Sequence, residues 1–135
     1  MRGYIPVTPK EIEEFASAGT FRFSHAYVMT TDYQRENVEE DHEELEFQLS
    51  YSAALESRER LQSQNGFVLA LDLELSQLGI ENEDTIQLTA DLRWSQVESV
   101  LVAESEEEEL TWFAGQEVET QLPIWLKGGL INGTA

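Results

Sequence analysis

The chain has 135 residues, with 27 acidic side chains against eight lysines and arginines, a formal net charge of −19 and no cysteine. The lack of cysteine excludes disulfides, cysteine-ligated metal centres and thiol nucleophiles, and the excess of carboxylates repels nucleic-acid phosphates and anionic lipids. The first ten residues lack the apolar stretch of a signal peptide, and no apolar run reaches the roughly 18 residues of a membrane span. We therefore expect a cytoplasmic protein that binds neither nucleic acid directly nor a membrane.

The clearest local signal is a helix near the start of the chain. Thr8 and Glu11 have the spacing of a capping box around a proline, and Gly19 stands where a left-handed residue ends a helix. These signals agree, so residues 9–18 are predicted to be helical.

The segments on either side of this helix favour strands. Residues 4–7 form a short apolar run that favours a strand. Because Pro6 has no backbone N–H to donate, either the strand lies at a sheet edge or Pro6 lies at the end of the strand. Residues 25–30 are typical of a second strand, and the polar residues 31–37 indicate a short helical turn or a loop.

A long helix is predicted over residues 41–62. Asp41 and Glu44 have the spacing of an N-terminal cap. Residues 45–53 also alternate as in a strand, but residues 53–60 are rich in helix formers, and this favours the helix. The apolar stripe expected to face the sheet at helical spacing is Phe47, Tyr51, Ala54, Leu55 and Leu61.

The second half of the chain predicts mainly strands. Alternation and β-branched content indicate strands over 67–75, 85–92, 97–104 and 110–113, and a closing helix over 117–125, limited by Pro123. The remaining segments are a polar connection over 76–84 anchored by Leu78 and Ile80, a turn or bulge over 94–96, and a solvated acidic loop over 105–109.

This order of elements predicts an α+β fold. We expect one domain over residues 1–126, with a mostly antiparallel or mixed sheet, two to three helices mainly on one of its faces, and helix 41–62 packed on the sheet. Residues 127–135 are rich in glycine and are expected to form a flexible C-terminal tail.

Five phrases of the sequence, taken together, resemble a known family. Arg-Gly-Tyr-Ile-Pro at the start, Glu-Glu-Leu-Glu-Phe in the long helix and Leu-Thr-Trp-Phe-Ala-Gly-Gln-Glu near the end are the longest of them; the other two lie at 68–72 and 97–100. The chain resembles a family of small acidic actinobacterial proteins known as a domain of unknown function. It departs from the family pattern at Gly3, at Gly115, where the family usually has proline, and in place of an alanine-rich segment it has the acidic run. The resemblance supports the order of elements and a cytoplasmic address, and it implies no activity.

The motifs of common enzyme classes are missing. There is no GxGxxG or GxxxxGK[ST] phosphate loop and no GxSxG nucleophile elbow. His25, at the start of a strand, is interpreted as a structural or exposed side chain. His42 with Glu39 and Glu43 is an alternative divalent-metal site, although neighbouring positions at a helix start do not converge. We assign no catalytic, cofactor-binding or metal-binding residue and expect no cofactor.

The function that the sequence favours is a non-enzymatic protein-interaction domain that engages a basic partner surface. The acidic segments 39–46 and 104–109 would steer the encounter, and an exposed aromatic would anchor it. Mimicry of nucleic acid by rows of carboxylates is a special case of this hypothesis. The residues expected to act are Glu106, Glu107, Glu108, Glu109 and Trp112.

The alternative function is a small enzyme or a domain that binds a ligand or a divalent metal through carboxylates. It predicts a concave pocket in which two acids converge with His25 or His42. The oligomeric state stays open, because an edge strand or an exposed tryptophan could also serve a homodimer.

Overall fold

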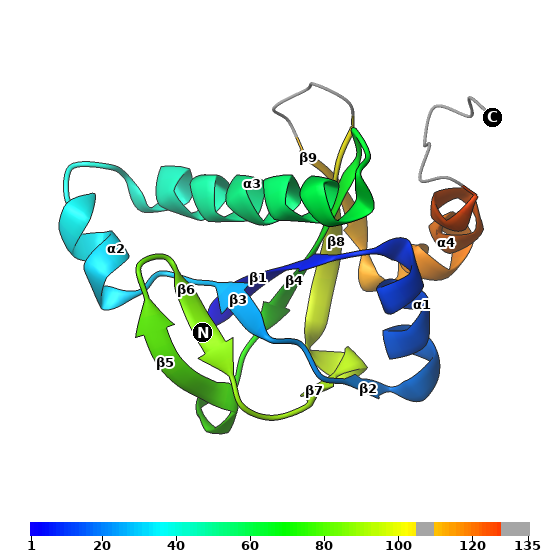
Figure 1. The fold of residues 1–135 in the computed structure, drawn as a ribbon, viewed down its shortest axis with the longest axis horizontal. Coiled ribbons are helices and arrows are strands. Elements are labelled where there is room, and N and C mark those ends of the chain that lie inside the picture. The colour runs from blue at the N-terminus through cyan, green and yellow to red at the C-terminus, as the bar shows by residue number, and fades with distance from the viewer. Residues whose placement is uncertain (105–109, 128–135) are drawn as a thin grey trace.

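A seven-stranded sheet forms the centre of the computed structural model, which describes residues 1–104 and 110–127, and the longest helix lies across it (Figure 1). The strands are β1 (Arg2–Val7), β2 (Thr20–Phe21), β3 (His25–Tyr27), β4 (Gly66–Asp72), β5 (Leu78–Asn82), β6 (Thr85–Leu88), β7 (Leu92–Arg93), β8 (Val97–Ala103) and β9 (Leu110–Ala114). The helices are α1 (Pro9–Ala18), α2 (Thr31–Glu36), α3 (His42–Leu61) and α4 (Val118–Leu126), and short 3₁₀ turns cover Leu75–Gln77, Trp94–Gln96 and Gly115–Glu117.

The strand order in the large sheet is β5-β6-β3-β1-β4-β8-β9, and β2 pairs with β7 in a small second sheet. Each recorded strand pair is antiparallel. The predicted α+β class, with a mostly antiparallel sheet and the long helix packed on it, is therefore confirmed. The described residues form four helices, whereas the sequence indicated two to three, because α2 forms a full short helix.

The capping signals predicted α1 to the residue. The Glu11 backbone N–H donates to Thr8 Oγ1 at 3.2 Å, and the Thr8 backbone N–H donates to the Glu11 carboxylate at 3.0 Å. Gly19 ends the helix with φ of 83°, in the left-handed region that glycine adopts without strain.

Strand β1 lies in the middle of the sheet, between β3 and β4, and not at an edge. Its pairing with β4 runs from Arg2 to Val7, but its pairing with β3 is recorded only at Tyr4. Pro6 is the next-to-last residue of the strand and lies past this pairing, where its carbonyl accepts a hydrogen bond from Arg60 at 3.1 Å. Of the two places expected for Pro6, an edge strand or the end of a strand, the structure shows the end of a strand.

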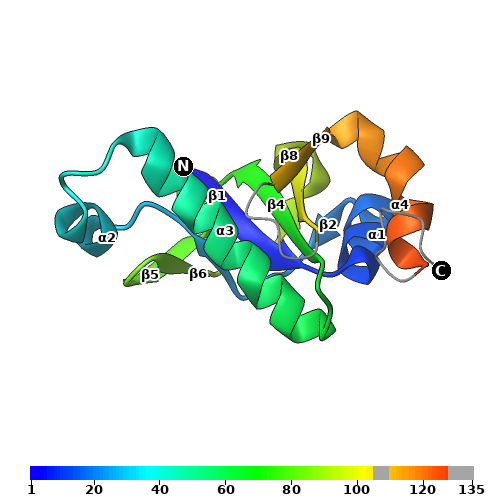
Figure 2. The same ribbon diagram turned by 90° about the horizontal axis from the view of Figure 1, so that it is seen from above.

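Helices cover both faces of the sheet, contrary to the expectation that they lie mainly on one face. Helix α3 lies along one side of the sheet, and α1 and α4 lie close together away from it (Figures 1 and 2). Alternate residues of β1, β4 and β8 pack with α3, while their neighbours join α1 and α4 in the larger core on the other face. Buried residues of α1 and α4 in that core include Ile12, Phe15, Val118 and Trp125. Full burial on both faces explains the uninterrupted apolar run of β4.

The side of α3 that faces the sheet agrees with the predicted stripe only in part: Ala54 is buried and Leu61 packs against the larger core. Phe47 and Leu55 are 40% and 42% exposed, whereas the buried positions are Leu45, Leu49, Ser50, Ala53, Ala54 and Ser57. Small residues let the helix backbone come close to the sheet. At Gly66 the approach is so close that a Cβ atom would overlap the carbonyl oxygen of Ala54.

The Ser57 hydroxyl joins α3 to the sheet. It donates to the Val7 carbonyl at 2.6 Å and accepts from the Phe67 backbone N–H at 2.8 Å, so it bridges the last residue pair of β1 and β4. Ser57 is fully buried, and its hydroxyl therefore supplies a hydrogen-bond partner to two backbone groups in the interior.

Two segments of the second half differ from the sequence predictions. Residues 78–82, predicted as a polar connection, form β5, and Ile80 is 75% exposed and no anchor. The single strand predicted over 85–92 is divided into β6 and β7, and β7 pairs with β2, a two-residue strand that the sequence did not indicate. The predicted acidic loop and most of the predicted tail lie outside the described residues.

Candidate functional site

A polar pocket of about 340 Å³ lies where α1, β1 and β3 meet the C-terminal half of α3. Its walls combine an apolar part from Ile5, Pro6 and Phe23 with charged and polar side chains. The polar lining residues are Glu11, Arg22, Ser24, His25, Glu56 and Arg60.

Three of these side chains form a continuous hydrogen-bonded chain. Ser24 Oγ lies 2.7 Å from His25 Nδ1, and His25 Nε2 lies 2.9 Å from Glu56 Oε1. The side chains of His25 and Glu56 keep 33% and 26% of their exposure, so the imidazole is held but can still be reached from solvent. His25, interpreted from the sequence as structural or exposed, is thus half-buried, hydrogen-bonded at both ring nitrogens and placed in a pocket.

Tyr27 fixes the carboxylate at the end of this chain. Its hydroxyl donates to the same Glu56 oxygen at 2.8 Å. Burial, and then the hydrogen bond to the Glu56 carboxylate, raise the pKa of Tyr27 far above its ordinary value. The phenol therefore keeps its proton and remains a donor to Glu56.

Two guanidinium groups lie in the same pocket. Arg60 donates to the Glu11 carboxylate at 2.8 Å, and this ion pair links α3 to α1. Arg22 is exposed, and no ion pair joins it to the rest of the described chain. Besides His25, the pocket therefore holds two carboxylates and two guanidinium groups, whose formal charges balance, on a strongly acidic molecule.

The second candidate region is the outer side of α3, which we define as Phe47, Tyr51 and Leu55. The rings of Phe47 and Tyr51 are stacked, with centroids 6.2 Å apart and planes at 16°. Trp112 on β9 is 60% exposed and pairs with Leu101, whose side chain packs into the α3-facing cluster. Directly opposed residues of an antiparallel pair share a face of the sheet, so Trp112 lies on the α3 side.

The other residues singled out in the sequence are not brought together. His42, Glu39 and Glu43 are exposed at the start of α3, where the Asp41 carboxylate caps the helix by accepting from two backbone N–H groups. Among the described residues, histidines and acids nowhere gather in a group of three that could hold a metal ion. Glu106, Glu107, Glu108 and Glu109 lie outside the described residues.

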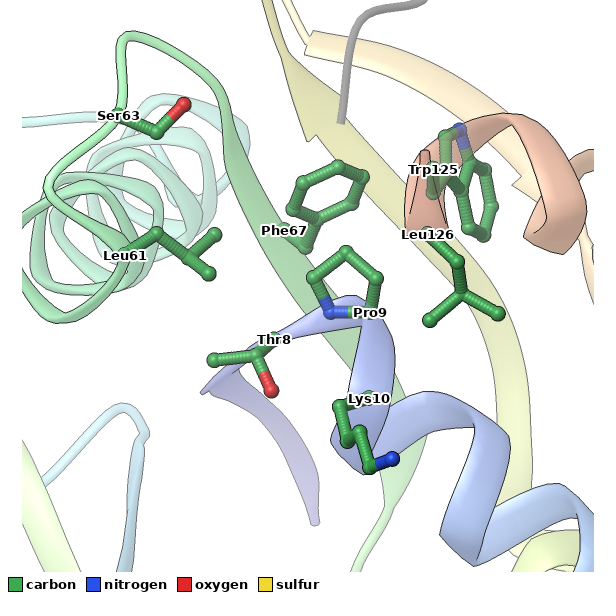
Figure 3. A pocket seen from close by; sticks show the side chains of 8 residues that line it. All are labelled: Thr8, Pro9, Lys10, Leu61, Ser63, Phe67, Trp125 and Leu126. Atoms are coloured by element: carbon green, nitrogen blue, oxygen red, sulfur yellow. The ribbon is translucent and has the colours of Figure 1, made fainter. Parts of the chain in front are cut away.

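Figure 3 shows a third hollow, of about 460 Å³, in which Phe67 and Pro9 lie between Leu61 on one side and Trp125 on the other. Trp125 is 1% exposed and packs edge-on against Phe67 and Phe113, with ring centroids 5.5 and 5.4 Å away. Lys10 is the charged residue of this mainly apolar lining. The hollow can take an apolar group but offers no acid–base pair.

The fold and these surfaces define a small acidic α+β domain with a polar pocket and an exposed apolar helix face. Residues 1–121 match the model of a family of unknown function, DUF6912, and the chain belongs to this family. The match includes the nine strands and helices α1 to α3, so the resemblance expected from the sequence to a domain of unknown function is confirmed. No curated protein and no solved structure matches the chain.

Within the described part of the chain, none of the helices has both the length and the apolar character needed to cross a membrane.

Proposed function

We propose that the outer side of α3 is a non-enzymatic interaction surface that binds a basic protein surface. The observation that carries the proposal is the place of Phe47 and Leu55. A helix that covers a sheet normally turns its largest apolar side chains inward, but here they are 40% and 42% exposed. Exposed apolar side chains grouped on one helix face are typical of protein-binding surfaces.

The charge around this face supports a partner with a basic surface. Residues 39–46, at the N-terminal end of α3, carry six carboxylates and no lysine or arginine: Glu39, Glu40, Asp41, Glu43, Glu44 and Glu46. An apolar centre with a charged rim is the usual anatomy of an interface, and the negative rim attracts a positive surface over long range. A second copy of this chain is disfavoured as the partner, because two molecules of charge −19 repel each other.

The aromatic rings give the basic partner specific contacts. The faces of Tyr51 and Trp112 accept lysine or arginine cations in cation–π contacts, and Trp112 is 60% exposed on the same side of the sheet as α3. We assign Trp112 the role of a second anchor. Glu106, Glu107, Glu108 and Glu109 precede β9 in the sequence, and we assign them the role of steering the encounter.

Affinity capture from a lysate of the host organism tests this proposal with three tagged forms of the protein. The wild type should retain a protein with a basic surface at low salt and release it at high salt, because salt screens exposed charges. Phe47→Ser combined with Leu55→Ser should weaken binding of that protein by about 30-fold, the loss of an interface hot spot. Replacing the four glutamates at 106–109 by glutamine should weaken binding and flatten its salt dependence.

The matched control is Ile80→Ser, which removes an equally apolar side chain that is 75% exposed on β5. It should bind as the wild type does. Equal capture by the α3 variant and the wild type, or a partner without a basic surface, would contradict the proposal.

A further inference from the structure

The pocket beside α3 contains the three parts of an activated hydroxyl nucleophile. Such a nucleophile needs a base within hydrogen-bond reach and a third group that orients the base. Ser24 Oγ and His25 Nδ1 are 2.7 Å apart, and Glu56 Oε1 is 2.9 Å from the other ring nitrogen. Ser24 is exposed, so a substrate can reach its hydroxyl.

The direction of the hydrogen bonds follows from chemistry. An ionised carboxylate accepts only, so the ring proton of a neutral His25 lies on Nε2 and points to Glu56. Nδ1 then carries the free lone pair and accepts from the Ser24 hydroxyl. Tyr27 donates to the same Glu56 oxygen at 2.8 Å and holds the carboxylate in place. Serine proteases use the opposite nitrogens, but a neutral imidazole has one donor and one acceptor in either arrangement.

The other residues of the pocket provide contacts for a substrate of Ser24. Arg22 and Arg60 line the same pocket. Arg60 is held by the Glu11 carboxylate and the Pro6 carbonyl, so we assign Arg22, which no ion pair joins to the rest of the described chain, to the negative charge that develops on a carbonyl oxygen. Ile5, Pro6 and Phe23 give an apolar wall, and a volume of about 340 Å³ fits a small organic molecule.

We propose that Ser24 is the nucleophile of an acyl-transfer site that accepts small carboxylic esters. Its Oγ attacks the ester carbonyl carbon while His25 Nδ1 takes the hydroxyl proton. The tetrahedral intermediate expels the alcohol, which receives that proton from His25, and leaves an acyl group on Ser24. Water, deprotonated by His25, then attacks the acyl carbon and releases the carboxylic acid and the free hydroxyl. Glu56 and Tyr27 are positioning residues that fix the imidazole tautomer. This site shares no residue with the outer side of α3, so it is independent of the partner surface.

The test is covalent labelling of the full chain with an alkyl fluorophosphonate, followed by peptide mass spectrometry. Attack by Ser24 forms an Oγ–P bond and expels fluoride, so the wild type should carry the adduct on Ser24. Ser24→Ala should remove the adduct, and His25→Asn should slow labelling on the order of 100-fold, the contribution of a general base. The exposed Ser95 gives the matched control, because Ser95→Ala should leave the labelling of Ser24 unchanged.

The variant Glu56→Gln tests whether Glu56 fixes the tautomer of His25 or only stabilises the fold. A glutamine amide can donate to Nε2 and so move the ring proton to Nδ1, which then no longer accepts from Ser24. We expect a changed ring ¹⁵N signature of His25, slow labelling and an unchanged thermal melting temperature. p-Nitrophenyl acetate should be hydrolysed by the wild type and not by Ser24→Ala. An adduct on another residue, no adduct at all, or labelling that survives His25→Asn would overturn the proposal.

Discussion

The two sides of α3 carry side chains in the reverse of the common distribution. Toward the sheet the helix turns two leucines together with serines and alanines, and toward solvent it turns Phe47, Tyr51 and Leu55. The inner side gains stability from close approach and hydrogen bonding to the backbone. The outer side keeps large apolar surface in contact with water, which contributes little to folding but is available for binding. In this helix, the small side chains that pack closely on the sheet therefore lie opposite the large side chains that we assign to a partner.

The largest effect on stability is expected from Ser57→Ala, which removes one hydroxyl oxygen from the inner side of α3. The change leaves the Phe67 N–H and the Val7 carbonyl buried without their partner. Each unsatisfied group costs about 1–3 kcal/mol, so we expect the free energy of unfolding to fall by about 2–4 kcal/mol. Urea denaturation measures it. Ser52→Ala, at a half-buried position of the same helix, is the control and should change stability by less than about 0.5 kcal/mol.

A smaller effect is expected from pH at Tyr4, which packs beneath the inner side. Burial and the Glu46 carboxylate raise the pKa of Tyr4 to about 12, from 10 in its ordinary state. The unfolded chain then loses the phenol proton first, so the stabilising contribution is complete below pH 10 and disappears as the pH rises through about 12. One proton changes the unfolding free energy by at most about 1.4 kcal/mol per pH unit.

Tyr4→Phe isolates this contribution, because the ring stays and only the titrating hydroxyl is lost. Urea denaturation between about pH 9 and about pH 11.5 should show stability falling more steeply in the wild type than in the variant. Parallel curves for the two proteins would show that Tyr4 titrates alike in the folded and the unfolded chain.

The features best predicted from the sequence are those determined by residues close together in the chain. Thr8, Glu11 and Gly19 act within one helix, so α1 was predicted at both ends. The existence of α3 and its cap at Asp41 were also predicted, but of the buried residues on its inner side the predicted stripe contained only Ala54. Hydrophobic periodicity assumes that the largest apolar residues face inward. Leu45 and Leu49 do so, but in the C-terminal half of α3 the close contact of Ala54 with Gly66 favours small residues on the inner side.

Contacts between distant residues were beyond prediction. Gln77 and Gln96 exchange side-chain amide hydrogen bonds of 2.9 and 2.8 Å in the interior, which fixes the turns beside β5 and β8, and nothing in either local sequence indicates this. The pocket is similar. Ser24 and His25 are adjacent in the sequence, but Glu56 is 31 residues from His25 and arrives through the packing of α3. The two-acid pocket of the alternative hypothesis named His25 as one option, but no local signal indicated Ser24 or Tyr27.

The smallest change in stability is expected from a truncation on the outer side of α3. Leu55→Ala removes three carbon atoms from the outer side, more than Ser57→Ala removes from the inner side, but Leu55 is already 42% exposed in the folded protein. Less buried apolar area is lost than at a core leucine, and alanine has the highest helix propensity, so we expect the unfolding free energy to fall by no more than about 1 kcal/mol. Urea denaturation of the two variants side by side measures the difference. A loss of 2 kcal/mol or more, about the cost of a leucine truncated in a core, would place Leu55 among the residues that hold the fold. It would then leave the outer side of α3 without its largest aliphatic contact for a partner.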